Sequence, residues 1–377
     1  MEPAQTFQYS SNAWENKTLE YDLDRFNWPQ WILSVIQEIE PDVVDLCKFH
    51  DVVPLDRLVQ VQRHVQQSFS RLEFMQRYDD FAELYLKSLL DNQPYLLKRQ
   101  PTLNVVLPNQ DRLGRRLTFH TGIMVSNGRG QGTIWMPLTR CGDTNSMWIA
   151  DLESSRRLNR RCIENQWSMS VYEKECLKIS SPVELVPGQA HLFHQEHVHG
   201  NVNNETGYTR MAIDWHVLPL GGEYKRRLPG GFFRLPGDHA QGTHRDYSCQ
   251  SFVSYLNHST DFTRGIPAVC QRMLIDNYCK QNKIIYSFHN SELEFFDWCP
   301  LLEHMIQQGP DGIVMPSIYS LPTEPARRNY LLDLAGKNKV VLHFANEICD
   351  THERDSVEKI KTYLEWGIEK LCAYSWE

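Results

Sequence analysis

Between residues 102 and 219 the chain breaks into short apolar runs separated by turns rich in glycine, proline and asparagine. These runs have the length and composition of strands, and they include "TLNVVLP", "LTFHTGIMV", "GTIWMPLT" and "TRMAIDWHVLP". The preceding stretch, residues 28–90, instead places apolar residues at three- and four-residue intervals, as amphipathic helices do. Helices followed by many short strands predict an antiparallel β-barrel or jelly roll with an N-terminal helical buttress.

The pattern changes near residue 245, where "LPGGFFRLPGDHAQGTHRDYS" is rich in glycine and proline and is typical of a boundary. Beyond it, helix-like and buried strand-like runs alternate, which predicts a small α/β domain with a largely parallel sheet. The fold class is therefore α+β. We expect an N-terminal helical region over 1–95, a barrel domain over 96–245 and an α/β domain over 250–377.

Composition limits the setting in which such a chain works. No apolar run approaches the roughly 20 residues of a membrane span, and the N-terminus lacks a signal pattern, so we expect a cytoplasmic protein without membrane contact. The ten cysteines form no CxxC pair, which indicates neither a zinc knuckle nor a disulfide framework.

The net charge of −8 argues against a nucleic-acid polymer as partner. Basic residues cluster only at Arg156 to Arg161 ("RRLNRR") and at Lys225 to Arg227 ("KRR"). Each cluster is either a solvated face or an opening for an anionic small-molecule substrate.

Histidines and one arginine form a pattern that suits a metal centre. His120 is followed two positions later by Gly122, where a carboxylate would complete a His-x-Asp pair. Downstream, His199 is followed eleven residues later by Arg210. A neutral imidazole binds iron, and a guanidinium holds a carboxylate through two parallel hydrogen bonds. Arg210 stands beside the apolar run "MAIDW", so burial without an anion would be costly, although ordinary barrel residues remain an alternative.

From about Arg99 to Asp238 the chain resembles phytanoyl-type iron(II)/2-oxoglutarate oxygenases of sporadic carbohydrate gene clusters. The resemblance is carried, in that family's order, by "KRQPTLNVVLP", "FHTGIMVSNGRGQGTIWMPLTRCGDTNSMWI" and "PGQAHLFHQEHVHGNVNNETGYTRMAIDW". It implies a double-stranded β-helix, iron(II) on His120 and His199, 2-oxoglutarate on Arg210, and O2 as co-substrate. Gly122 falls where the family carries its aspartate.

The motif His120-Thr121-Gly122 resembles the His-x-Ala or His-x-Gly motif of aliphatic halogenases, in which chloride or bromide takes the carboxylate's place. It implies a halogenase (chlorinase) with a halide position at Gly122. The substrate would be a small polar metabolite, such as a nucleotide, a nucleoside or a sugar phosphate, in natural-product biosynthesis. Two alternatives stay open: a hydroxylase that recruits Glu196 or another carboxylate, and a catalytically inactive scaffold or sensor.

Residues 255–350 resemble another protein of those gene clusters and, distantly, the catalytic fold of serine recombinases. Ser259 would take the nucleophile's place, but Asn257 and Ser320 stand where that chemistry needs basic residues. From residue 251 onward, 12 Lys and Arg face 17 Asp and Glu, a poor platform for DNA. We therefore expect a docking or substrate-covering module, or one that forms a homodimer.

Overall fold

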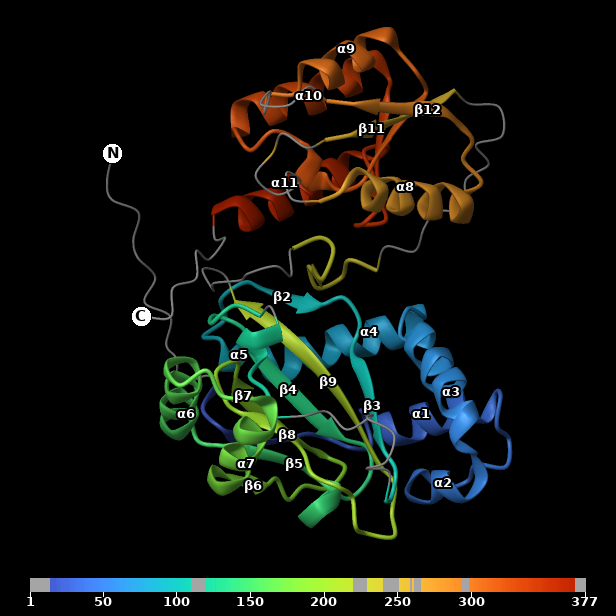
Figure 1. Cartoon of the computed structure of the whole chain (residues 1–377). Coiled ribbons are helices and arrows are strands. Elements are labelled where there is room, and N and C mark those ends of the chain that lie inside the picture. Colours follow the sequence, from blue (N-terminus) through green and yellow to red (C-terminus); the bar gives the residue numbers. More distant parts are fainter. Residues whose placement is uncertain are drawn as a thin grey trace. The chain divides into compact units, whose positions relative to one another are not determined.

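The computed structural model describes residues 14–109, 119–125, 127–219, 229–239, 251–257, 260, 266–292 and 298–369. The chain divides into two compact units (Figure 1). The first draws on Met1–Arg227 and Phe233–His239, and the second on Leu228–Phe232 and Ala240–Glu369. None of the described helices combines the length and the apolar character needed to cross a bilayer.

The first unit holds two antiparallel sheets. One has seven strands in the order β1-β7-β4-β9-β2-β10, with β3 paired to β9, and the other has the order β6-β5-β8. The strands are β1 Lys17–Glu20, β2 Tyr95–Lys98, β3 Thr102–Val106, β4 Gly132–Pro137, β5 Met147–Ala150, β6 Ser180–Pro182, β7 Gln189–His194, β8 His199–Asn201, β9 Arg210–Pro219 and β10 Phe233–Arg234. The expected mixture of helices and antiparallel sheets is confirmed.

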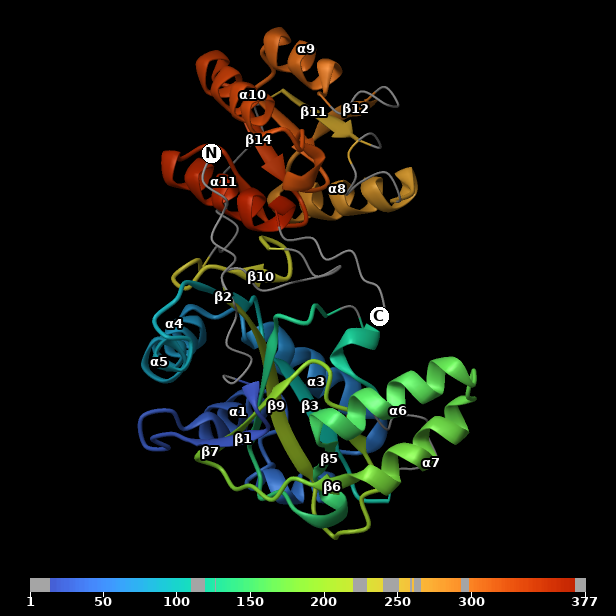
Figure 2. The same cartoon turned by 90° about the vertical axis from the view of Figure 1, so that its left-hand side faces the viewer.

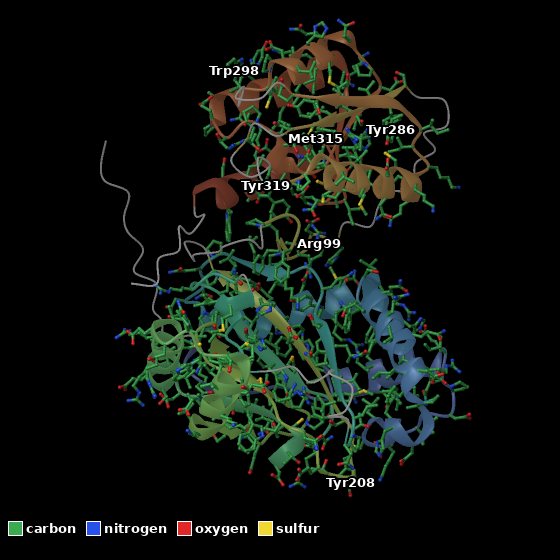
Figure 3. The ribbon with its side chains drawn as sticks, in the orientation of Figure 1. Arg99, Tyr208, Tyr286, Trp298, Met315 and Tyr319 are labelled. Atoms are coloured by element: carbon green, nitrogen blue, oxygen red, sulfur yellow. The ribbon has the colours of Figure 1, made fainter. Side chains whose placement is uncertain are left out.

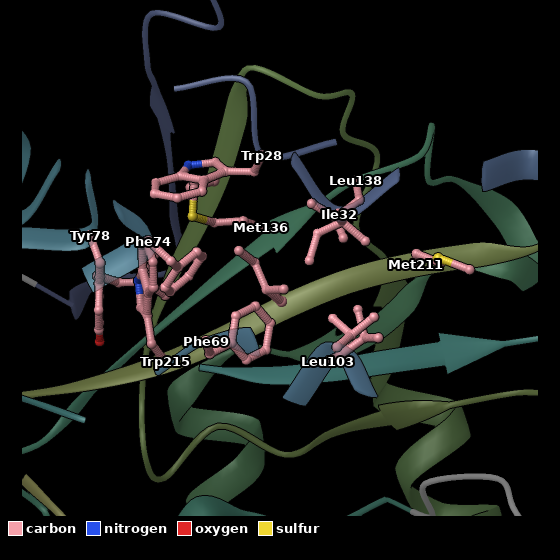
Figure 4. Packing of buried hydrophobic residues seen from close by; sticks show 14 of the residues in the cluster. Trp28, Ile32, Phe69, Phe74, Tyr78, Leu103, Met136, Leu138, Met211 and Trp215 are labelled. Carbon is pink, nitrogen blue, oxygen red and sulfur yellow. The ribbon is translucent and has the colours of Figure 1, made fainter. Parts of the chain in front are cut away.

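Helices pack against one face of the seven-stranded sheet. They are α1 Trp28–Gln37, α2 Phe49–Val52, α3 Leu55–Ser68, α4 Leu72–Phe81 and α5 Lys87–Leu89, while α6 Leu152–Glu164 and α7 Met169–Ile179 lie between β5 and β6 in sequence. Trp215 of β9 stacks on Tyr78 of α4, with ring centroids 4.4 Å apart, and contacts Trp28 edge-on at 6.0 Å (Figure 4). The helices therefore cover an aromatic, fully buried face.

Strand β9 divides its side chains between two environments, because successive side chains of a strand point to opposite faces. Met211, Ile213, Trp215 and Val217 all belong to the cluster that the helices cover. The alternating residues Arg210, Ala212, Asp214 and His216 therefore face the other side of the sheet. This second face carries the polar residues on which the candidate site is built.

The second unit is a five-stranded sheet in the order β12-β11-β13-β14-β15. Its first three pairings are parallel, and only β14 and β15 run antiparallel. The elements are β11 Phe252–Leu256, α8 Ala268–Asn282, β12 Tyr286–Ser291, α9 Pro300–Gln308, β13 Gly312–Met315, α10 Pro325–Asn338, β14 Val341–Phe344, β15 Cys349–Asp350 and α11 Arg354–Glu369. Figures 1 and 2 show α9 and α10 on one side of this sheet and α8 and α11 on the other.

Candidate active site

The fold brings His120 and His199 together across a backbone pairing. The amide nitrogen of each residue donates to the carbonyl oxygen of the other, at 2.9 Å in both directions, and the ring centroids lie 4.4 Å apart. The Nδ1 of His199 lies 2.9 Å from the carbonyl oxygen of His197. Nδ1 therefore carries the proton and donates it, which leaves the lone pair of Nε2 for a metal. Burial and the neighbouring His120 lower the pKa of His199 to about 3, so the ring is neutral, as a ligand must be.

The chain beyond His120 is not the strand that its apolar letters predict. Gly122–Val125 is a 3-10 helix, and His120 contributes only an isolated bridge. Met124 N donates to Thr121 O at 3.1 Å, and Asn127 N donates to Gly122 O at 3.0 Å. The prediction of a strand through "LTFHTGIMV" is therefore wrong over 121–125, because the backbone N–H and C=O groups hydrogen-bond to near neighbours in sequence instead of joining a sheet.

Gly122 lies against a side chain that sequence reasoning did not identify. A Cβ built at Gly122 would lie 1.8 Å from Oε1 of Gln195 and 2.8 Å from Nδ2 of Asn127. The Gln195 amide is 1% exposed and is held on both sides. Its Oε1 accepts from Asn127 at 2.6 Å, and its Nε2 lies 2.6 Å from Thr133 Oγ1 and 3.2 Å from His216 Nδ1. The space beside Gly122 is thus occupied by a fixed amide, and only glycine fits there without displacing it.

A third histidine, cysteine or carboxylate does not join the pair within the described part of the chain, which holds no cluster of three such groups placed to bind a metal ion. Glu196 instead lies 2.5 Å from Arg156, 3.5 Å from Nδ1 of His194 and 3.6 Å from Nε of Arg129. Burial alone raises the pKa of Glu196, but the hydrogen bond from Arg156 and the nearby positive charges lower it overall. Glu196 is therefore a carboxylate enclosed by cations.

Arg210 is a buried cation that forms no direct ion pair with a described residue, although the Asp214 carboxylate acts on it from a longer distance. It is 1% exposed, its Nη2 donates to Asn201 Oδ1 at 2.6 Å, and its guanidinium lies 5.5 Å from the Trp135 ring centre. Its Nε has no hydrogen-bond partner, and burial lowers its pKa. Burial of a guanidinium is costly unless a carboxylate or phosphate balances it. Arg210 therefore has the features of a residue that holds an anionic ligand.

Asn201 connects this arginine to the histidine pair. It stands two residues after His199 on β8, so the two side chains share a face about 6.6 Å apart along the strand. The same interior holds Asp214, which accepts from Lys98 at 3.2 Å and from Asn104 at 2.8 Å. An interior lined with charged and amide groups suits a polar ligand better than a closed apolar core.

Two of the arginines in the basic run line a cavity. This cavity has a volume of about 470 Å³ and is lined by Ile123, Arg129, Arg156, Asn159, Arg160, Ile163, Glu164 and Glu196. The other two point elsewhere: Arg157 approaches Ser154 Oγ at 3.5 Å, and Arg161 lies 5.1 Å over the Trp167 ring. The second basic cluster, residues 225–227, lies outside the described residues.

A larger cavity of the first unit, about 810 Å³, lies apart from these arginines and includes Tyr208, labelled in Figure 3. Its lining also holds Asp45, Asp143 and Glu184. A lining with three carboxylates is a poor site for an anion.

The second unit brings together the two residues that stand where recombinase chemistry needs basic side chains. Asn257 and Ser320 are fully buried, and Asn257 Nδ2 donates to the carbonyl oxygen of Ser320 at 2.7 Å. Asn257 also approaches the sulfur of Cys299, whose thiol pKa is raised by burial to about 12. Ser259 lies outside the described residues. These contacts are those of a packed polar core.

Comparisons with known proteins give only weak likenesses. No family model matches this chain, and no curated protein matches it. Among solved structures it is similar to EctD from S. alaskensis with 2-oxoglutarate and 5-hydroxyectoine, at 13% identity over 57% of this chain and 78% of that one, with a TM-score of 0.39. It is also similar to HygX from Streptomyces hygroscopicus with nickel and 2-oxoglutarate bound (11% identity, 55% and 84%, TM-score 0.33). The N-terminal catalytic domain of TP901-1 integrase matches 31% of this chain and 92% of its own, at 18% identity and a TM-score of 0.26.

Proposed function

We propose that this chain is a non-haem iron(II)/2-oxoglutarate-dependent oxygenase that halogenates an aliphatic carbon of a small polar metabolite. The observation that carries the proposal is a pair of neighbouring histidines that no third histidine, cysteine or carboxylate of the described residues joins to form a metal-binding group. Most iron sites of this kind use two histidines and a carboxylate. Two protein ligands leave one further position for a halide.

The residues fit the co-substrates in two respects. His199 presents Nε2, because its Nδ1 is already committed to the backbone, so His120 and His199 would hold iron(II). Arg210 would hold the far carboxylate of 2-oxoglutarate through its unpartnered Nε–H, while Nη2 of the same guanidinium is held by Asn201. When bound, iron(II) with 2-oxoglutarate and O2 supplies the oxidising power to replace hydrogen on an unactivated carbon.

Charge balance favours an anion beside Gly122. Two neutral imidazoles leave iron(II) with two positive charges, of which the chelating carboxylate of 2-oxoglutarate neutralises one. In a three-ligand site the protein carboxylate neutralises the other, and here chloride or bromide would do so. Asn127 Nδ2 lies 2.8 Å from the point where a Gly122 side chain would begin, and it has a second hydrogen besides the one that it donates to Gln195 Oε1. Such donors favour a small anion.

One observation favours a second candidate, a hydroxylase with an amide ligand. Gln195 Oε1 lies 1.8 Å from the Cβ position at Gly122, where the side chain of a metal-binding aspartate would start. In that case Gln195 would supply the oxygen that Gly122 does not, water would take the open position, and the product would gain oxygen. The ligand position that chloride would fill in the halogenase is thus the one that Gln195 would fill in the hydroxylase.

Anaerobic absorption spectroscopy of the full chain tests both candidates and the inactive-scaffold alternative. Iron(II) and 2-oxoglutarate should together give a weak visible charge-transfer band, which a scaffold would not show. For the halogenase, added chloride shifts this band and the product of turnover gains chlorine. For the amide-ligand hydroxylase, chloride leaves the band unchanged, and Gln195→Ala lowers iron affinity. Thr206→Ala, in the loop before β9, is a matched polar control distant from Gln195 in sequence.

A further inference from the structure

The 470 Å³ cavity next to helix α6, here called the α6 cavity, is built from one helix face and two turns. Arg156, Asn159, Arg160, Ile163 and Glu164 recur at three- and four-residue spacing, so they project from one side of α6. Ile123, Arg129 and Glu196 close it from the opposite side. Its volume lies within the range of about 300–1,000 Å³ that small-molecule sites occupy.

Positive charge predominates in this cavity. Three guanidiniums, of Arg129, Arg156 and Arg160, face two carboxylates, of Glu164 and Glu196. Glu196 is already enclosed by Arg129 and Arg156. Arg160 forms neither an ion pair nor a side-chain hydrogen bond within the described ranges. The lining therefore carries one net positive charge, and the Arg160 guanidinium is open to a ligand.

Asn159 adds a hydrogen-bond donor to the lining of this cavity. This side chain is 4% exposed, and its Oδ1 accepts from the hydroxyl of Tyr172 at 3.0 Å. Its Nδ2 forms no hydrogen bond to any residue that the structure describes. Nδ2 is not one of the fully buried atoms that lack a partner, so solvent reaches it and it is open to an acceptor that enters the cavity.

The α6 cavity adjoins the segments that carry the candidate metal site. Gly122 packs against Gln195, while the residues that follow them, Ile123 and Glu196, line the cavity. Ile123 is three residues after His120, so their Cα atoms lie no more than about 11 Å apart at 3.8 Å per residue. A ligand anchored in the cavity could therefore place a carbon several bonds away near the histidine pair.

We propose that the α6 cavity binds the phosphate group of a phosphomonoester, and that this phosphomonoester is the substrate of the proposed oxygenase. A phosphate monoester carries close to two negative charges and three acceptor oxygens near neutral pH. Arg156, Asn159 and Arg160 offer several donors along one face of α6, which suits three oxygens better than the two of a carboxylate. Glu196 holds Arg156 at the rim through its 2.5 Å contact, so this cation is positioned before the ligand arrives.

Calorimetric titration of the full, metal-free chain with inorganic phosphate at an ionic strength of about 0.15 M tests this site. The matched variants are Arg160→Gln, which removes the unpaired cation, and Arg157→Gln, which removes a cation from the same helix outside the cavity. Arg160→Gln should weaken phosphate binding about tenfold or more, since a hydrogen bond to a charged group is lost. Arg157→Gln should leave the dissociation constant within about twofold, because exposed charges beyond contact distance are screened.

Three results would overturn the assignment. They are no phosphate binding by the unmodified chain, equal weakening by both variants, and tighter binding of malonate than of phosphate. Tighter binding of glucose 6-phosphate than of glucose supports it. The claim that the phosphomonoester is a substrate rests on the proposed function. The titrations themselves use no iron and no 2-oxoglutarate. A failed titration therefore leaves the oxygenase proposal untouched, and a missing charge-transfer band leaves the phosphate site untouched.

Discussion

The close packing of Gly122 against Gln195 predicts that Gly122→Ala destabilises the first unit strongly for so small a change. The added Cβ would lie 1.8 Å from Oε1, and contacts below 3.0 Å essentially never occur, so the amide must retreat by at least about 1.2 Å. That movement breaks its 2.6 Å bonds with Asn127 and Thr133. Two lost hydrogen bonds cost about 1–3 kcal/mol, and buried groups left unsatisfied add about 1–3 kcal/mol more. We expect a loss of about 2–6 kcal/mol.

Urea denaturation followed by tryptophan fluorescence measures this loss, because Trp28, Trp135 and Trp215 lie in the first unit. The companion Gln195→Ala removes the obstacle, so Gly122→Ala should cost less in that background, with a coupling of about 1–2 kcal/mol. A cost under about 0.5 kcal/mol, or an equal cost in both backgrounds, would refute the view that Gln195 makes glycine necessary here.

Three further outcomes are expected. His199→Ala should abolish iron(II) binding in equilibrium dialysis, since only two protein ligands are proposed; retained affinity would contradict the ligand assignment. Arg210→Ala should weaken 2-oxoglutarate binding, titrated by the charge-transfer band, by about 2–5 kcal/mol, because a buried carboxylate loses its charged partner; unchanged affinity would place the co-substrate elsewhere. The Arg71 hydrogen bond lowers the pKa of Glu38 from 4.5 to about 2, so the pair stabilises the fold above pH 4.5 and this contribution fades as the pH falls toward 2. Glu38→Gln should flatten acid denaturation curves in that window, and an unchanged curve would show that the pair adds nothing measurable.

Local patterning predicted those parts of the structure that depend on neighbours in sequence. The alternation of "TRMAIDWHV" predicted a strand, and β9 shows why: its odd-numbered residues meet the helices and its even-numbered ones meet the polar interior. The apolar residues after His120 led to a wrong strand prediction, because composition cannot distinguish a strand from a 3-10 turn whose hydrogen bonds close locally.

Gln195 shows what sequence reasoning could not supply. Its importance comes from an approach to Gly122 across the fold, and its partners Asn127, Thr133 and His216 come from separate segments. The polar run "HQEH" directly after a strand was the only available signal. Asn159 is similar, because its hydrogen bond with the Tyr172 hydroxyl appears only when α6 and α7 are placed together.

The two faces of β9 have a consequence for how the molecule reaches its native state. A slip of one residue in this strand would move Arg210 and Asp214 among the aromatic rings of the helices and turn Trp215 toward the polar interior. The slipped register would lose the stacking of Trp215 on Tyr78 and bury two charges without partners. The register of β9 that builds the aromatic core is therefore the same register that places Arg210 on the polar face.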